Sequence, residues 1–174
     1  MHARFLLIPT AAISISTPLH AEVYLTVEEA QALIFPGAAL TADFRELTDE
    51  QATAIKKASG VGVENRRLKA WRVPGGGWFL VDQVLGKHDY IPFALGIDAT
   101  GAVKAVEILE YREAYGGEIR NAKWRAQFIG KREGADLKIG KEIKNISGAT
   151  ISSKHVTDGV RRLMSTYAIV LAEH

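Results

Sequence analysis

Residues 146–153 read Ile146-Ser147-Gly148-Ala149-Thr150-Ile151-Ser152-Ser153, and a helical pattern follows them directly. The first backbone N–H groups of a helix have no partner within the helix, and the helix dipole places partial positive charge there, which stabilises a phosphate. Gly148 and Ala149 have almost no side chain, so a ligand can approach the backbone, and Thr150 adds a hydroxyl. For a bare S-G-x-T sequence, an ordinary Ser/Thr helix cap is the simpler interpretation.

The C-terminal helix is predicted to run from about Ser153 to Ala172. Apolar residues recur on one stripe of it, at Val156, Val160, Leu163, Met164, Tyr167 and Leu171. This stripe should pack on a sheet, which would place Thr150 at the rim of that sheet.

Upstream, the pattern is typical of β-hairpins. Strands are predicted over residues 68–73, 78–85, 90–97 and 102–110. The glycines at 75–77 are interpreted as a hairpin turn and not as a phosphate cradle, because a strand follows them and no helix does. Asp98 is interpreted as a turn residue bonded to its own backbone, in preference to a metal ligand.

Two helices are predicted nearer the N-terminus. Thr26 and Thr48 each begin a capping box, with Glu29 or Gln51 three residues later. The fold class predicted is therefore α+β: an antiparallel sheet of hairpins packed by a C-terminal amphipathic helix, with a small N-terminal helical layer. The expected organisation is a signal peptide over 1–21, a helical region over 22–66 and a ligand-binding domain over 67–174.

The first 21 residues resemble a secretory signal. Arg4 supplies the positive charge, residues 5–15 are mostly apolar, and Leu19-His20-Ala21 is a plausible cleavage site. An uncleaved anchor is the weaker alternative, since a bilayer span needs about 20 apolar residues. The expected location is the periplasm of a Gram-negative cell.

Composition excludes several function classes. The 174 residues contain 22 basic and 20 acidic side chains, without a basic run of the kind that binds nucleic acid. The absence of cysteine excludes disulfides, thiolate nucleophiles and Cys-based metal sites. The surroundings of His88, His155 and His174 suggest neither a zinc site nor a Ser-His-Asp arrangement, so no metal ligand or catalytic residue is assigned.

From about Gly86 onward, an ordered series of motifs resembles the FMN-binding domain family. The series comprises Gly86-Lys87-His88, Gly96-Ile97-Asp98, the stretch from Tyr111 to Glu118, Trp124, Gln127 to Lys131, and the S-G-A-T-x-[ST] signature at 147–152. The resemblance is to the small exported members of the family, related to the domains of Rnf and Na⁺-translocating NADH:quinone reductase complexes. It implies FMN as cofactor, with Thr150 carrying it as a phosphoester.

The resemblance implies a set of cofactor-binding residues. Those around the signature are Ile146, Ser147, Gly148, Ala149, Thr150, Ser152 and Ser153. Glu113 occupies the position of an acidic residue beside the isoalloxazine, with a solvated loop carboxylate as its alternative. Tyr115, Gly116 and Gly117 form a backbone able to approach a flat ring. Whether Tyr115 stacks on the ring or packs in the loop is left open.

One residue departs from the family pattern. Family members usually carry Asp three residues before the Ser, where this chain has Lys144, followed by Asn145. Lys144 either pairs with the FMN phosphate or is solvated. If the attaching enzyme reads the Asp, attachment is slow or absent, although the fold can still hold FMN without a covalent bond.

The function expected is that of an exported flavoprotein transferring electrons between redox partners, rather than a stand-alone catalyst. A flavin transferase would attach the cofactor, and a membrane oxidoreductase or cytochrome would exchange electrons with it. The alternative is a non-redox binding or assembly module that keeps the fold without flavin.

Overall fold

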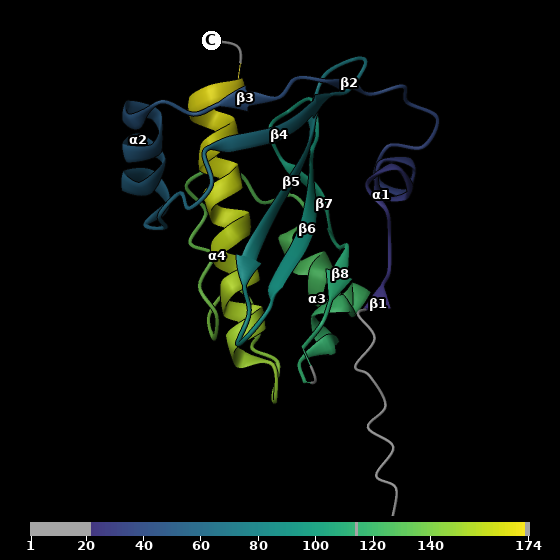
Figure 1. Ribbon diagram of the computed structural model, residues 1–174, viewed down its shortest axis with the longest axis vertical. Helices are drawn as coiled ribbons and strands as arrows, with labels where there is room; N and C mark the ends of the chain where they lie inside the picture. Colours follow the sequence, from purple (N-terminus) through teal and green to yellow (C-terminus); the bar gives the residue numbers. More distant parts are fainter. Residues whose placement is uncertain (1–21, 114, 173–174) are drawn as a thin grey trace, which may run out of the picture.

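A computed structural model describes residues 22–113 and 115–172 of the chain. The predicted signal peptide lies outside these residues. A six-stranded antiparallel sheet forms the centre of the molecule, in the order β2-β4-β5-β6-β7, with β3 also pairing with β4 (Figure 1). Its strands are β2 (Thr41–Ala42), β3 (Arg45–Glu46), β4 (Arg67–Arg72), β5 (Trp78–Leu85), β6 (Tyr90–Ile97) and β7 (Val103–Ile108). The predicted α+β class is confirmed.

Both predicted hairpin turns are present. Gly75, Gly76 and Gly77 connect β4 to β5 with φ of 82°, 104° and 99°, a left-handed backbone that disfavours other residues. Between β6 and β7, Asp98 Oδ1 accepts hydrogen bonds from the backbone N–H groups of Thr100 and Ala102. Asp98 is thus a turn residue, as predicted.

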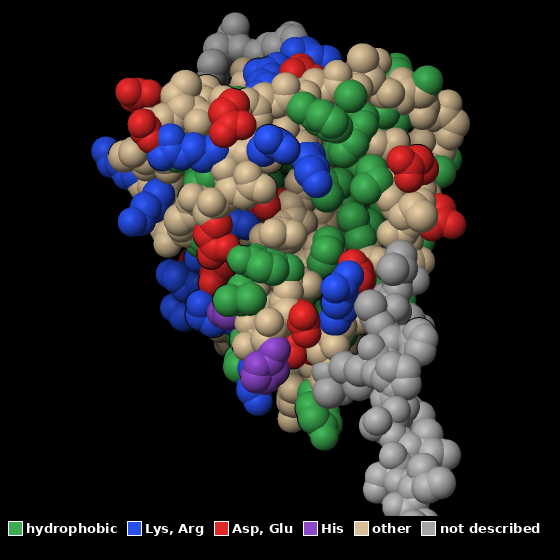
Figure 2. Space-filling view, in the orientation of Figure 1, with side chains coloured by type: hydrophobic (Ala, Val, Ile, Leu, Met, Phe, Trp, Pro, Cys, Tyr) green, Lys and Arg blue, Asp and Glu red, His purple; other side chains and the backbone are tan. Residues whose placement is uncertain are grey.

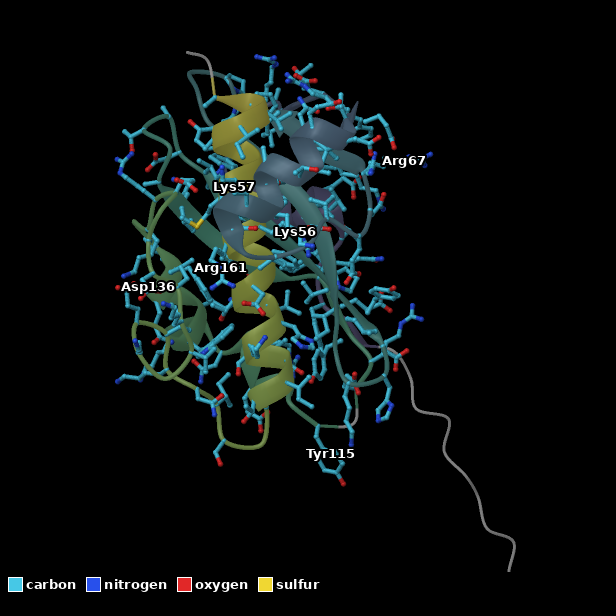
Figure 3. The ribbon with its side chains drawn as sticks, turned by 90° about the vertical axis from the view of Figure 1, so that its left-hand side faces the viewer. Lys56, Lys57, Arg67, Tyr115, Asp136 and Arg161 are labelled. Atoms are coloured by element: carbon cyan, nitrogen blue, oxygen red, sulfur yellow. The ribbon has the colours of Figure 1, made fainter. Side chains whose placement is uncertain are left out.

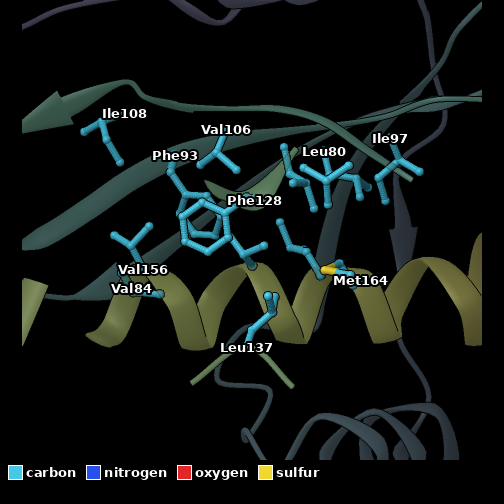
Figure 4. Packing of buried hydrophobic residues seen from close by; sticks show 14 of the residues in the cluster. Leu80, Val84, Phe93, Ile97, Val106, Ile108, Phe128, Leu137, Val156 and Met164 are labelled. Atoms are coloured by element: carbon cyan, nitrogen blue, oxygen red, sulfur yellow. The ribbon is translucent and has the colours of Figure 1, made fainter. Parts of the chain in front are cut away.

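The C-terminal helix α4 (Thr150–Thr166) crosses one face of the sheet and continues as a π-helical segment, Tyr167–Leu171. Figure 4 shows Val156 and Met164 of α4 facing Phe93 and Leu80 of the sheet. Gly159 allows this close approach, because a Cβ there would lie 2.8 Å from the Phe93 ring. The predicted apolar stripe therefore forms the main core.

The predicted start of this helix, at about Ser153, was wrong. The Ser153 N–H donates to the Ala149 carbonyl at 2.9 Å, which makes Thr150 the first helical residue and Ala149 the N-cap. Ser152 and Ser153 are hydroxyl residues, a type that prefers the N-cap position. Here their side chains bond elsewhere, and the helix begins without a side-chain cap.

The two N-terminal helices do not lie together. Both predicted capping boxes are present, at α1 (Val27–Ile34) and α2 (Asp49–Ser59). However, α1 packs with Phe79 and Ala94 in a second cluster, whereas Ile55 of α2 belongs to the main core with α4. Figure 1 shows the helices on opposite sides of the sheet, because each buries its apolar stripe on a different face.

Short elements between the sheet and α4 complete the fold. They are β1 (Glu22–Val23), which pairs with β8 (Glu110–Tyr111), the 3-10 turns η1 (Gly117–Arg120) and η2 (Ala126–Phe128), and α3 (Ala122–Arg125). Trp124 and Phe128 are both buried, with ring centroids 5.3 Å apart. None of the helices in the described ranges has the length and apolar character needed to cross a bilayer.

Candidate functional site

A cavity of about 480 Å³ opens where the β5–β6 turn, the loop after β8 and the start of α4 meet. This is the lower end of the molecule in Figure 2, where His, Lys and hydrophobic side chains gather on the surface. The residues that line it are Lys87, His88, Glu113, Tyr115, Gly148, Ala149, Thr150, Ile151 and Ser152. The volume lies within the range of roughly 300–1,000 Å³ typical of small-molecule sites.

The start of α4 presents backbone donors to this cavity. Gly148 has φ of 83°, and the Ala149 N–H donates to the Ile146 carbonyl at 3.0 Å, so the chain turns sharply into the helix. Because the first intrahelical bond comes from Ser153, the N–H groups of residues 150–152 have no helical acceptor. No side chain caps them at Ala149. Their dipoles and the exposed Thr150 hydroxyl suit a phosphate group.

The serines of the signature have other partners. Ser152 is buried, and its Oγ lies 2.9 Å from the Tyr111 hydroxyl. The Tyr111 hydroxyl donates its one proton to the Tyr115 carbonyl, so it accepts from Ser152. Burial raises the pKa of Tyr111, which keeps this hydroxyl neutral and able to donate.

Ser153 is fully buried, and its Oγ donates to Asn145 Oδ1 at 3.1 Å. Ser147 is exposed and Ile146 half-buried against the main core, and neither lines the cavity. Thr150 is thus the hydroxyl of the signature that is both exposed and at the cavity wall.

Glu113 connects the two loops of the site. Its Oε1 accepts the backbone N–H of His88 at 2.6 Å and that of Asp89 at 3.1 Å. Partial burial would raise the pKa of Glu113, but these N–H donors outweigh it and lower the pKa, so the group is a carboxylate at neutral pH. A Cβ on Gly86 would lie 2.6 Å from the same oxygen. The carboxylate therefore fixes the β5–β6 turn and also lines the cavity.

The loop after Glu113 packs on the start of α4. A Cβ at Gly116, where φ is 98°, would lie 2.4 Å from the Tyr111 hydroxyl oxygen and 3.3 Å from the Ala149 Cβ. Tyr115 lines the cavity but is 86% exposed, and Figure 3 shows it projecting from the lower end. Gly117 is half-buried and does not line the cavity.

Lys144 lies outside the cavity wall, with its backbone firmly held. The Trp124 indole N–H donates to the Lys144 carbonyl at 2.8 Å, and the Lys144 N–H donates to Gln127 Oε1 at 2.9 Å. Its side chain is exposed. The sequence reasoning did not assign four polar residues to the site: Lys87 and His88, which line the cavity, and Asn145 and Tyr111, which contact Thr150 and Ser152. These placements depend on contacts that only the folded chain forms.

The fold and this site define the class of the domain. Residues 86–165 match the FMN-binding domain family, and this match supports FMN as the cofactor. The residues present fit that cofactor, since N–H groups without a helical acceptor and the exposed hydroxyl of Thr150 lie at a cavity of suitable size. The contact of each individual residue with FMN stays a prediction.

A named relative lies within the same family. The chain is 35% identical over 81 residues to a component of the Na⁺-translocating ferredoxin:NAD⁺ oxidoreductase complex of Acetobacterium woodii. The match covers 41% of this chain and 39% of that relative. The chain therefore matches well under half of the length of this relative.

Proposed function

We propose that the protein is an exported flavoprotein that carries FMN on Thr150 through a phosphoester bond and passes electrons between redox partners. The observation that carries the proposal is the exposed Thr150 hydroxyl at the cavity wall, beside backbone N–H groups with no helical acceptor. The N–H groups of Thr150, Ile151 and Ser152 would hold the phosphate, and Gly148 and Ala149 would leave room for it. When bound, FMN supplies the redox chemistry.

The surrounding loop would orient the cofactor. Glu113 and Tyr115 line the same cavity as Thr150, so a flavin anchored at Thr150 would lie near a fixed carboxylate and an exposed aromatic ring. A carboxylate near the ring would disfavour added negative charge and tune the reduction potential. The high exposure of Tyr115 means that this end of the cavity is open to a docking partner.

The partners follow from the same assignment. A flavin transferase would use FAD to esterify Thr150. The relative, which is part of a Na⁺-translocating oxidoreductase complex, supports a membrane oxidoreductase or cytochrome as the redox partner. The resemblance of the first 21 residues to a secretory signal supports export to the periplasm. Lys144, at the position where the family usually has Asp, favours the second candidate, a non-redox binding or assembly module that keeps the fold without flavin.

The test is co-expression of the full chain with a flavin transferase in an exporting host, followed by intact mass and flavin fluorescence on a denaturing gel. We expect a yellow protein heavier by one FMN residue. Thr150→Val should lose the label with little loss of stability, since it keeps the shape and removes an exposed hydroxyl. Ser152→Ala and Ser153→Ala should keep the label.

A colourless protein of unmodified mass beside an active transferase would refute the covalent assignment and support the second candidate. A labelled Thr150→Val protein with an unlabelled serine variant would instead mean that the attachment site is wrong.

A further inference from the structure

We infer that Asn145 positions the Thr150 hydroxyl for flavin transfer and stays bonded to the same oxygen after the phosphoester has formed. The inference rests on the proposed attachment at Thr150. Its basis is a side-chain pair: Asn145 Nδ2 donates to Thr150 Oγ1 at 3.1 Å. Asn145 therefore contacts the proposed reacting atom directly through a polar side chain.

The second half of the Asn145 amide fixes its orientation. Asn145 Oδ1 accepts the Ser153 hydroxyl at 3.1 Å, a proton that Ser153 shares with the Thr150 carbonyl at 3.2 Å, and Ser153 is fully buried on α4. Because the oxygen of the amide faces Ser153, its NH₂ group faces Thr150. The amide thus spans the first turn of α4 and holds one rotamer of the Thr150 side chain.

The loop before α4 brings Asn145 to this place. Trp124 and Gln127 bond both backbone groups of the preceding residue, Lys144. Gly148 then reverses the chain with φ of 83°, a left-handed conformation that disfavours other residues. The chain folds back over the helix start, and a residue five positions before Thr150 comes within hydrogen-bond distance of it.

The donor character of the amide suits both sides of the transfer. In the reaction, Thr150 Oγ1 forms a bond to the FMN-side phosphorus of FAD, and the pyrophosphate P–O bond breaks. AMP leaves with the bridging oxygen and its electron pair, and the hydroxyl proton passes to the released AMP or to solvent. Before transfer, the oxygen accepts the Asn145 N–H through a lone pair, and its own proton stays free to leave. Afterwards, the ester oxygen has no proton, so only a donor can remain in contact with it. A carboxylate at 145 would meet an ester oxygen next to a negative phosphate.

The closing experiment measures labelling kinetics of the purified chain with flavin transferase and FAD. Asn145→Asp removes the donor at nearly constant shape, and Asn145→Ala removes it without adding charge. We expect the labelling rate at saturating protein to fall about tenfold in both, the value of one hydrogen bond to a reacting group. The KM for the protein should stay within about twofold, and the unfolding temperature should be unchanged, since Asn145 is exposed and affects orientation and not docking.

Asn65→Asp is the matched control. It makes the same substitution away from the cavity and keeps its own bond, because Asn65 Oδ1 accepts the Arg67 N–H at 2.9 Å. It should label at the wild-type rate. If both Asn145 variants label within about twofold of wild type, or if their loss appears only as a raised KM or a lower unfolding temperature, the positioning role is wrong while attachment at Thr150 stands. A wild-type chain that takes no label at all overturns both proposals.

Discussion

Gly116→Ala should disrupt the start of α4 from the opposite side of the site. Gly116 has φ of 98°, and an added Cβ would lie 2.4 Å from the Tyr111 hydroxyl oxygen and 3.2 Å from Ser152 Oγ. The substitution therefore forces a left-handed backbone on alanine and displaces a buried hydrogen-bonded pair. The Tyr111 hydroxyl would lose the Tyr115 carbonyl, Ser152 or both.

The magnitude is the sum of two costs. A non-glycine residue in the left-handed region costs about 1–2 kcal/mol. A buried polar pair that loses its partners costs a further 1–3 kcal/mol or so. The free energy of unfolding should therefore fall by about 2–5 kcal/mol, which corresponds to a decrease in unfolding temperature of roughly 5–15 °C for a chain of this size.

Urea or thermal unfolding followed by circular dichroism measures this effect, and Gly130→Ala is the matched control. Gly130 also has a positive φ, of 77°, but an added Cβ there has no heavy atom within 4 Å. In the control, the free energy of unfolding should fall only by the cost of the left-handed backbone, about 1–2 kcal/mol. Equal losses in the two variants would refute the packing argument. We also expect Gly116→Ala to slow labelling of Thr150, because the same contacts support the helix start.

Three further changes test the electrostatics of the fold and site. Arg162→Met should lower the free energy of unfolding by about 3 kcal/mol in urea, because it removes the buried guanidinium that donates to Asp82 Oδ2 at 2.7 Å. An unchanged urea midpoint would contradict this. The pKa of Asp43 is lowered to about 2, mainly by its hydrogen bond to Arg45, so its contribution to stability is present above the ordinary pKa near 3.8 and lost as pH falls toward 2. Asp43→Asn should flatten the pH dependence of the unfolding temperature in that window, and an unchanged slope would sink the assignment. Lys144→Asp should speed labelling of Thr150, and it should leave the unfolding temperature unchanged because the side chain is exposed. Slower labelling would mean that Lys144 binds the phosphate. An unchanged labelling rate would mean that Lys144 is only solvated.

The features predicted correctly from the sequence depend on neighbouring residues. The capping boxes at Thr26 and Thr48 bond groups three residues apart, and the glycines at 75–77 adopt φ values that few other residues tolerate. The apolar stripe of α4 follows from helical periodicity alone. Each of these features depends on residues that are close together in the sequence, so the sequence alone is enough to predict it.

Tertiary structure decided the rest of the site. The first residue of α4, the contact of Asn145 with Thr150, and the placement of α1 and α2 on opposite faces do not follow from local preference. Tyr111 reaches Ser152 across 41 residues of sequence, and Glu113 reaches His88 across 25. Such contacts form only when two distant elements pack against the same core. The sequence therefore determined which residue offers the hydroxyl, and the packing of α4 on the sheet determined which groups surround it.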